Sequence, residues 1–368
     1  MGRLERRSLL LAWSLLPFLT PARKRVLLGR FDPPELACEN GAGEIAALLG
    51  IRRADAAIVR NPALLPSLAR QVDALTADAI VLGDPGYPSR LEAIADPPLA
   101  FFARGRLELA SAQSIAVVGS RRASPYGENA ARRLASALAS RGITVVSGMA
   151  RGVDAAAHFA ALGASPGSTV AVLGTGLDVA YPPEHRELRD RIAAEGLLLT
   201  EFAPGSPPRR EHFPIRNRII AGLSLGVVVI EAGEKSGSLI TARLAAEEGR
   251  EVFAVPGSIF SRNTIGSHRL IQDGAKLVGR VEDILEEIAE LAELAASPQA
   301  PPERRAPVSP ELARVLGALS AEDGTAVDAA AAQLGVGVEW LAPRLLALEL
   351  AGEVRALPGT RYIITAGS

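Results

Sequence analysis

The sequence has little cysteine, no excess of charge and no long apolar run, and each shortage excludes a class of protein. The single cysteine, Cys38, rules out intramolecular disulfides and zinc sites built on several cysteines, as is typical of a reducing compartment. The formal net charge is -1, so a site for a polyanion has to be local. No apolar run reaches the ~20 residues that a membrane span needs. We therefore expect a cytoplasmic protein without a membrane-spanning segment.

With 368 residues, of which 48% are hydrophobic, the chain can form one large domain and one or two small ones. Its first part, residues 1–85, is rich in Leu, Ala and Arg and is broken by short Pro- and Gly-containing stretches, which predicts a small helical module. The basic start and the apolar run from Leu9 to Leu19 resemble a signal peptide. We favour an amphipathic helix over Leu9 to Leu16 as the opening of that module.

Strand and helix patterns alternate over residues 86–290. Six short apolar runs lack the period-two alternation of half-buried strands, so both of their faces are predicted to be buried. Each is followed by a helical pattern, as in Ala131, Leu134, Ala135 and Leu138. This alternation predicts an α/β fold with a Rossmann-like, doubly wound and mostly parallel sheet. The runs are "SIAVVG", "ITVVSG", "STVAVLG", "LLLTE", "GVVVIEA" and "EVFAVPG".

The end of the chain has a different composition. Residues 291–307 are rich in Pro, Ala and charge and are predicted to form a linker. Residues 308–368 show three helical patterns and then a hairpin pattern, which predicts a winged helix. From Pro310 onward, the sequence contains four arginines and seven carboxylates, which gives a net charge of -3. Such a block is poorly suited to phosphates, so we expect it to contact proteins instead.

Ligands of open parallel sheets bind beyond the carboxyl ends of the strands, so we searched the loops that follow them. The first such loop contains two arginines before a helix start, where Ser124 can cap and Pro125 suits the first position. Free helix N–H groups and two guanidinium groups favour an anion. An ordinary turn with exposed arginines is the alternative. The candidate residues here are Gly119, Ser120, Arg121 and Arg122.

The loop after "LLLTE" combines arginines with one aromatic ring. Arg209, Arg210, Arg216, Arg218 and Phe213 lie close together with a single glutamate, Glu211. Cations for phosphates and an aromatic face for a base are typical of a protein that binds single strands. Alternatively, Phe213 packs the helix against the sheet. The candidate binding residues are Arg210, Phe213, Arg216, Asn217 and Arg218.

A third loop, "AGEKSGS", combines a lysine with small residues at a helix start, which indicates a second anion site. Glu234 stands where a Walker A loop has glycine, and no strand end carries the G-x-G-x-x-G of dinucleotide-binding proteins. The histidines other than His158 have no metal-binding spacing; they are His185, His212 and His268. We therefore expect neither a metal nor a cofactor. The candidate residues of this loop are Lys235, Ser236, Gly237 and Ser238.

Asp154 and His158 are four residues apart on one predicted helix face, which is compatible with an acid–base pair. No nucleophile elbow surrounds the nearby Ser147. We favour the simpler interpretation, in which the pair fixes a loop or satisfies a buried histidine.

Seven ordered blocks between about 115 and 275 resemble the DNA-processing protein A family, also called DprA or Smf. The flanking parts are similar, more weakly, to a sterile-alpha-motif-like (SAM-like) helical domain and a winged-helix domain. The blocks are "GSRRASPYG", "SGMARGVDAAAH", "GTGLDVAYP", "FPIRNRIIAGLS", "EKSGSLITARLA", "VFAVPGS" and "GSHRLIQDGA".

This resemblance implies a bacterial, cytosolic, non-enzymatic protein that binds single-stranded DNA in natural transformation. It further implies that the protein protects incoming strands, helps to load the RecA recombinase and forms a homodimer through its Rossmann-like domain. The implied DNA pocket comprises Arg121, Arg210, Phe213, Arg216, Asn217 and residues 235–238. Relatives often carry lysine at the position of Arg210, so the charge is kept but its geometry changes.

An enzyme is the alternative. Lysine-decarboxylase-like phosphoribohydrolases have a related fold and cleave nucleoside monophosphates with a glutamate near the sugar. Glu231 is the candidate for that role. However, "EAGEKSGSLITA" lacks the PGGxGTxxE signature of those enzymes and has no glutamate in the helix. We therefore expect no catalytic residue.

Overall fold

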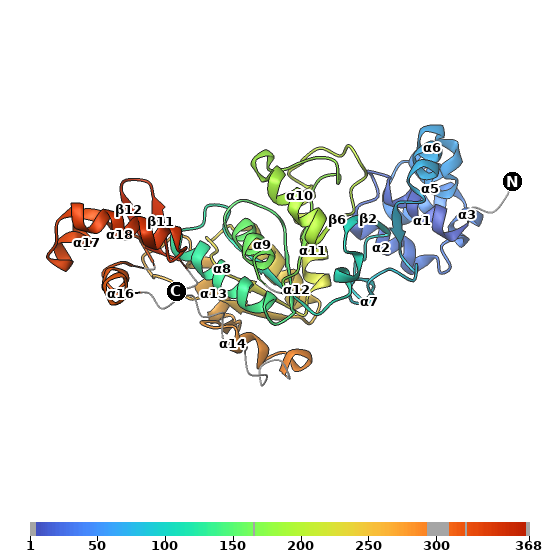
Figure 1. Ribbon diagram of the computed structural model, residues 1–368. Helices are drawn as coiled ribbons and strands as arrows, with labels where there is room; N and C mark the ends of the chain where they lie inside the picture. Colours follow the sequence, from blue (N-terminus) through green and yellow to red (C-terminus); the bar gives the residue numbers. More distant parts are fainter. Residues whose placement is uncertain (1–4, 165, 293–308, 321, 366–368) are drawn as a thin grey trace.

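The computed structural model describes residues 5–164, 166–292, 309–320 and 322–365 (Figure 1). It has a helical module at the N-terminal end, a central sheet covered by helices on both faces, and a small C-terminal block at the opposite end. Most of the predicted linker, from 293 to 307, lies outside the described residues. No helix in the described ranges is long and apolar enough to cross a lipid bilayer.

The N-terminal module is held together by its first helix. Leu9, Leu10, Leu11 and Trp13 are buried, and the Trp13 indole N–H donates to the Val59 carbonyl over 2.8 Å. The predicted opening helix is thus confirmed. The helices are α1 (Arg6–Ser14), α2 (Pro21–Arg30), α3 (Leu36–Glu39), α4 (Ala42–Leu49), α5 (Arg53–Arg60), η1 (Pro62–Leu64) and α6 (Pro66–Leu75).

The central sheet has the order β1-β2-β6-β5-β4-β3-β7-β8-β9 and is parallel from β6 to β9. Strands β1 and β2 form an antiparallel edge. The strands are β1 (Ala79–Val81), β2 (Ala100–Gly105), β3 (Ser114–Val118), β4 (Thr144–Ser147), β5 (Thr169–Val172), β6 (Leu197–Thr200), β7 (Gly226–Val229), β8 (Glu251–Ala254) and β9 (Lys276–Leu277).

The predicted doubly wound fold and all six predicted strands are confirmed, with β3 to β7 buried on both faces. The sequence analysis missed β1, β2 and β9. These strands lie at or near the edges, and β1 and β9 have only three and two residues. Strand β1 falls within residues 1–85, so part of that segment belongs to the sheet rather than to the helices.

Hydrophobic cores lie on both faces of the sheet. Helices α8, α9, α10 and α14 cover one face, and α7, α11 and α12 cover the other. The central helices are α7 (Ser89–Glu92), η2 (Leu107–Ala110), α8 (Pro125–Ala139), α9 (Val153–Leu162), η3 (Pro183–His185), α10 (Arg186–Glu195), α11 (His212–Leu223), α12 (Gly237–Glu247), α13 (Ile265–Gln272), α14 (Glu282–Leu285) and η4 (Ala289–Leu291).

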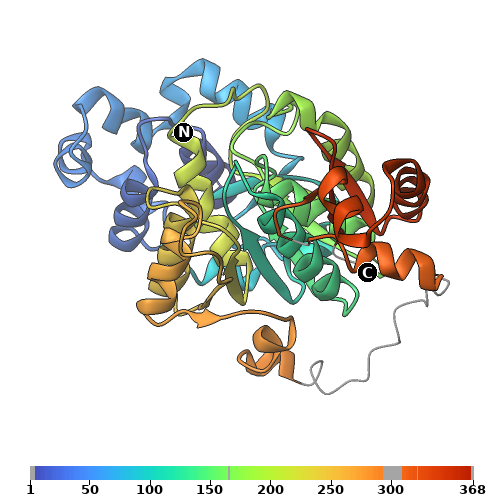
Figure 2. The ribbon, with the colours of Figure 1, turned by 90° about the vertical axis from the view of Figure 1, so that its left-hand side faces the viewer.

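In its described residues, 309–320 and 322–365, the C-terminal block has three helices and a three-stranded sheet of order β10-β12-β11, which confirms the predicted winged helix. It lies against α8 (Figure 2), where Arg355 pairs with Glu128 over 3.0 Å and the Asn129 amide donates to the Ile364 carbonyl. Its elements are α16 (Pro310–Leu316), β10 (Thr325–Ala326), α17 (Val327–Leu334), α18 (Val338–Leu350), β11 (Val354–Leu357) and β12 (Arg361–Ile364).

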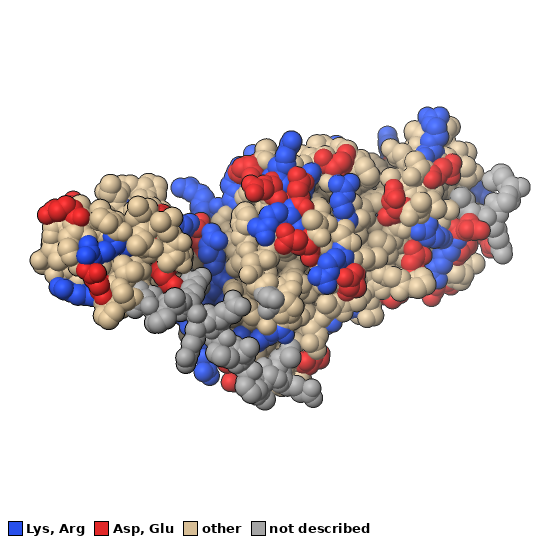
Figure 3. Space-filling view, in the orientation of Figure 1, with Lys and Arg blue, Asp and Glu red and all other residues tan. Residues whose placement is uncertain are grey.

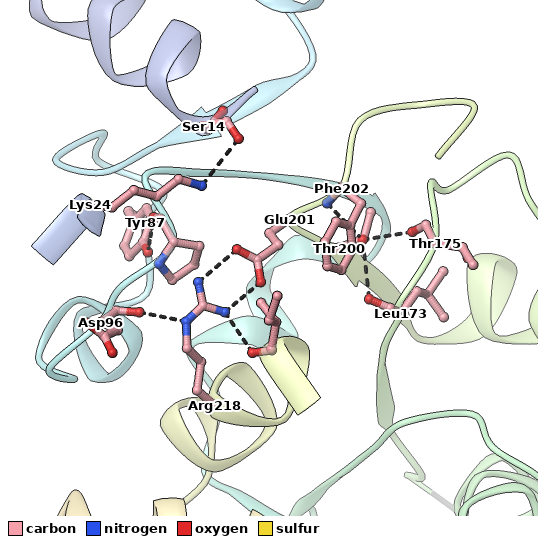
Figure 4. A network of polar contacts seen from close by, with 12 residues as sticks. Ser14, Lys24, Tyr87, Asp96, Leu173, Thr175, Thr200, Glu201, Phe202 and Arg218 are labelled. Carbon is pink, nitrogen blue, oxygen red and sulfur yellow. Dashed lines mark hydrogen bonds and ion pairs between the residues drawn. The ribbon is translucent and has the colours of Figure 1, made fainter. Parts of the chain in front are cut away.

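A buried charge network joins the helical module to the central sheet (Figure 4). Arg218 on α11 donates two hydrogen bonds to the Glu201 carboxylate, of 2.6 and 2.7 Å. Lys24 on α2 is nearly buried beside them, and its ammonium donates to the Ser14 carbonyl. Burial lowers the pKa of Lys24 to about 8, although the nearby Glu201 carboxylate opposes that shift. Glu201 is therefore the negative charge that balances two buried cations.

We expect Glu201→Gln to lower the free energy of unfolding by about 3 kcal/mol, because the substitution leaves buried cations without a counter-charge. Chemical denaturation followed by circular dichroism measures the loss. Glu195→Gln is the control, since Glu195 forms only an exposed pair with Arg191 and should cost under about 1 kcal/mol. Equal effects of the two substitutions would contradict a stabilising role for the buried network.

Candidate nucleic-acid interface

A cavity of about 1030 Å³ opens at the carboxyl end of β3. Strand β3 lies where the winding of the sheet reverses, since β4 pairs with it on one side and β7 on the other. The loops that follow β3 and β7 diverge there, and such a point is where open α/β sheets bind ligands. The cavity walls come from these loops, from the loops after β4, β5, β6 and β8, from α11 and from the start of α12.

The backbone of the loop after β3 passes close to the start of α9 where it reaches the cavity. A Cβ at Gly119 would lie 2.7 Å from the Val153 side chain, so only glycine fits there without a shift. The loop then exposes Arg121, whose guanidinium carbon lies 5.1 Å from the centroid of the Phe213 ring. This is a cation–π distance, and it places a charge beside an aromatic face. Gly119, Ser120, Arg121 and Arg122 all line the cavity.

Arg216 on α11 forms the floor of the cavity and is only 4% exposed. It donates to the Val172 carbonyl, while its Nε has no hydrogen-bond partner among the described residues. Burial lowers its pKa to about 10, and the nearby Asp154 carboxylate opposes the shift, so the side chain is charged at neutral pH. A Cβ at Gly148 would lie 2.0 Å from Arg216 Nη1, so this buried charge depends on a glycine.

The first turn of α12 forms another wall. Ser236 is the N-cap, and its side chain accepts from the Ser238 N–H over 3.4 Å. The Asn217 amide donates to the Gly237 carbonyl and so ties α11 to α12. The start of a helix carries a partial positive charge, to which Lys235 adds a full one. Residues 235–238 and Asn217 all line the cavity.

The lining is strongly cationic. It contains six cationic side chains and one carboxylate, Asp154. Across the described residues none of the six cations forms an ion pair, although the Asp154 carboxylate lies near Arg216, so their charge is available to a ligand. The six are Arg121, Arg122, Arg210, Arg216, Lys235 and Arg262. On the face in Figure 3, by contrast, positive and negative side chains are interspersed, in keeping with the net charge of -1.

The structure brings twelve of the thirteen candidate residues to this cavity and leaves out Arg218. The expectation that Arg218 faces the ligand is wrong in this structure, because its guanidinium is held in the buried pair with Glu201. Arg216 and Arg218 are two residues apart on one helix and therefore point in different directions. The alternative offered for Phe213 holds in part, since its ring packs close to Gly174 and also lines the cavity.

Among the other residues that line the cavity, the sequence analysis missed three whose side chains bear on the ligand. Tyr181 lies with its ring centroid 5.4 Å from that of Phe213, and Arg262 and Asn263 come from the loop after β8. The Asn263 amide donates to the Arg122 carbonyl and so joins two walls of the cavity. The search of loops that follow the carboxyl ends of strands could have found Arg262 and Asn263, because both come after the end of β8.

Asp154 and His158 serve the structure, as the sequence analysis favoured. The Asp154 carboxylate accepts from the Gly148 and Ala150 N–H groups, both over 3.2 Å, and fixes the loop after β4. Burial raises its pKa, which Arg216 opposes. The His158 ring is fully buried against the Thr169 hydroxyl, and burial lowers its pKa to about 3. The ring is therefore neutral and unsuited to carry protons for a reaction in the cavity.

Glu231, the candidate for an enzymatic role, does not line the cavity. Its carboxylate accepts from the Ser124 N–H over 2.9 Å and from the Ser124 hydroxyl over 2.5 Å. It thereby holds the start of α8, where a negative charge is stabilised by the helix dipole. In the described ranges, no group of three or more His, Cys, Asp or Glu residues is arranged to hold a metal ion.

The fold and the cavity define a Rossmann-like protein with a cation-lined site for an anionic ligand. Residues 78–289 match the model of the family described as DNA recombination-mediator protein A, and residues 296–360 match that of the DprA winged helix domain. Because the first match covers more than half of the chain, the chain belongs to the DNA recombination-mediator protein A (DprA) family.

Individual relatives agree with this assignment. DNA processing protein DprA of Streptococcus pneumoniae is 45% identical over 241 residues, which cover 64% of this chain and 85% of the relative. Protein Smf of Escherichia coli is 44% identical over 282 residues, 74% of each chain.

Two solved structures are similar as well. The S. pneumoniae structure has a TM-score of 0.64 at 39% identity and covers 78% of this chain and 99% of its own. DNA processing protein A of Helicobacter pylori, described with a unique single-stranded DNA binding mode, has a TM-score of 0.52 at 29% identity, over 58% and 96% of the two chains.

We expect the buried His158 to make folding sensitive to acid. Its pKa is 6.5 when unfolded and about 3 when folded, so the neutral ring favours folding above pH 6.5 and loses that contribution as the pH falls. Between pH 7.5 and pH 5 the loss is about 2 kcal/mol. Denaturant unfolding at both pH values measures it, with His158→Gln as the comparison. Equal pH dependence of the two proteins would contradict the buried neutral ring.

Proposed function

We propose that this chain binds single-stranded DNA in the cation-lined cavity at the end of β3. The observation that carries the proposal is the excess of six cations over one carboxylate in a cavity that also presents the Phe213 ring. Phosphates lie along the arginines and the first turn of α12, while an unstacked base lies against Phe213. Bases inside a duplex are not free to stack in this way, so single strands are preferred.

The proposed binding does not depend on sequence. The lining offers guanidinium groups, a lysine, serines and aromatic rings, all of which suit a phosphate or the face of any base. The H. pylori relative, whose structure is described in terms of single-stranded DNA binding, supports the same ligand class.

We further propose that the protein catalyses no reaction and acts in the bacterial cytoplasm. The two carboxylates considered for catalysis, Asp154 and Glu231, are engaged in holding the β4 loop and the start of α8. In this proposal the protein protects incoming strands in natural transformation and recombination. It hands them to the RecA recombinase, and it works as a homodimer formed through the Rossmann-like unit.

The C-terminal block is proposed to contact proteins rather than DNA. Its net charge of -3 opposes phosphate binding. Helix α18, which corresponds to the recognition helix of a winged helix, exposes the apolar side chains of Val338, Leu346 and Leu350. An exposed apolar face of this kind is more typical of a protein contact than of a DNA contact.

We expect Arg121→Ala to weaken single-strand binding about tenfold at physiological salt and to reduce the slope of log K against log salt by about 0.7, the value of one phosphate contact. Fluorescence anisotropy with an oligo-dT strand measures both quantities. Arg104→Ala on β2 is the matched control, because Arg104 is exposed and lies outside the cavity. A salt-independent affinity, or wild-type binding by the Arg121 variant, would place the site elsewhere.

Removal of the chain after residue 300 should leave single-strand affinity within roughly tenfold of the full-length value, since the proposed phosphate contacts all lie upstream. The same anisotropy titration tests this, and circular dichroism confirms that the shortened protein is folded. A larger loss of affinity in a folded protein would show that the winged helix contributes directly to the DNA site.

A further inference from the structure

The loop that follows β8, residues 256–264, is firmly held although it lies on the surface. The Thr264 hydroxyl donates to the Ser258 carbonyl over 2.6 Å, and the Tyr126 hydroxyl donates to the Pro256 carbonyl over 2.7 Å. Thr264 is itself buried, and the Asn263 amide holds the loop to the Arg122 carbonyl. The loop is thus fixed at its base, at its far end and against the neighbouring cavity wall.

This fixed loop exposes two large apolar side chains. Phe260 is 91% exposed and Ile259 is 80% exposed, although the bulk of these side chains favours burial. Neither side chain belongs to any of the hydrophobic cores. The fold therefore gains little from an aromatic ring at position 260, while the loop holds that ring in water.

The position of the loop indicates what covers Phe260. Arg262 and Asn263, two and three residues further along, line the cavity, and Asn263 is bonded to Arg122 in another wall, so the loop that carries Phe260 forms part of the cavity wall. An aromatic ring next to unpaired cations is the combination that single-strand binding proteins use, with the ring for a base and the cations for phosphates. A second copy of this chain is disfavoured as the occupant. A self-complementary contact through this loop would bring two cationic cavity walls together.

We propose that Phe260, with Ile259 beside it, is a second stacking platform, which receives a base of the DNA strand where the strand leaves the cavity. The inference rests on the proposed single-strand binding and extends it from one base at Phe213 to a strand that crosses the loop after β8. Because a base has a stacking face whatever its identity, this platform adds affinity without adding sequence preference.

The test compares two lengths of single strand on the full-length protein. We expect Phe260→Ala to weaken binding of a dT strand of about 12 nucleotides by about tenfold, and to leave a strand of about 4 nucleotides nearly unaffected, because the short strand is held within the cavity. The salt dependence should not change, since no phosphate contact is lost. Phe260→Tyr should keep the affinity, and Phe159→Ala, which removes another exposed ring outside the cavity, should have no effect.

A direct signal comes from Phe260→Trp. The indole added by this substitution should lose fluorescence when dT strands bind, with the same midpoint as the anisotropy titration, because a base stacks on it. The existing Trp13 is buried, and Trp340 lies in the C-terminal block, so neither should respond. Thermal unfolding checks that the variants are folded, which the exposure of the side chain leads us to expect.

The outcomes separate the two proposals. If the wild type binds no single strand of either length, the proposed function fails and the platform fails with it. If the wild type binds both strands and Phe260→Ala binds the longer one as tightly, the platform is wrong while the cavity proposal stands. If Phe260→Ala changes the sedimentation of the protein without changing its affinity for the longer strand, the loop is a contact between copies, and the platform is likewise overturned.

Discussion

The cavity depends on one buried charge, the guanidinium of Arg216. It lies under the loops where the winding of the sheet reverses, donates to the Val172 carbonyl and is balanced by Asp154. Gly148 leaves room for the group, since a Cβ there would overlap it. A guanidinium that is buried, ionised at neutral pH and incompletely hydrogen-bonded favours the binding of an anion in the cavity next to it. The cationic side chains of the surrounding loops add further positive charge to the cavity.

Each acidic group considered around this charge has a structural task. Asp154 balances Arg216 and holds the loop after β4, Glu231 holds the start of α8, and Glu201 neutralises Arg218. These carboxylates therefore do not pair with the exposed cations of the cavity, whose charge is available to an anionic ligand. A protein with a net charge of -1 can thus carry a strongly positive site, because among the described residues that line the cavity six are cations and one, Asp154, is a carboxylate.

The sheet and most of the cavity were predictable because burial leaves a clear pattern in the sequence. Strands buried on both faces give continuous apolar runs, and the loops after parallel strands meet at one edge of the sheet. The short edge strands β1 and β9 leave no such pattern. The sequence could not separate Arg216 from Arg218 either. The two differ only in the direction of the side chain, and Glu201, the partner that holds Arg218 away from the cavity, lies 17 residues earlier at the end of β6.

The arrangement of the cavity favours a strand over a free nucleotide. A mononucleotide carries its charge on one phosphate and needs one anion site, as at a single helix start. Here the cations come from four loops and from α11, and the loop that supplies Arg262 also exposes Phe260. Cations distributed over that many loops match a polymer that carries a negative charge on every monomer. Aromatic rings at two positions match a polymer that carries a base on every monomer. A polymer with both repeats is a nucleic-acid strand.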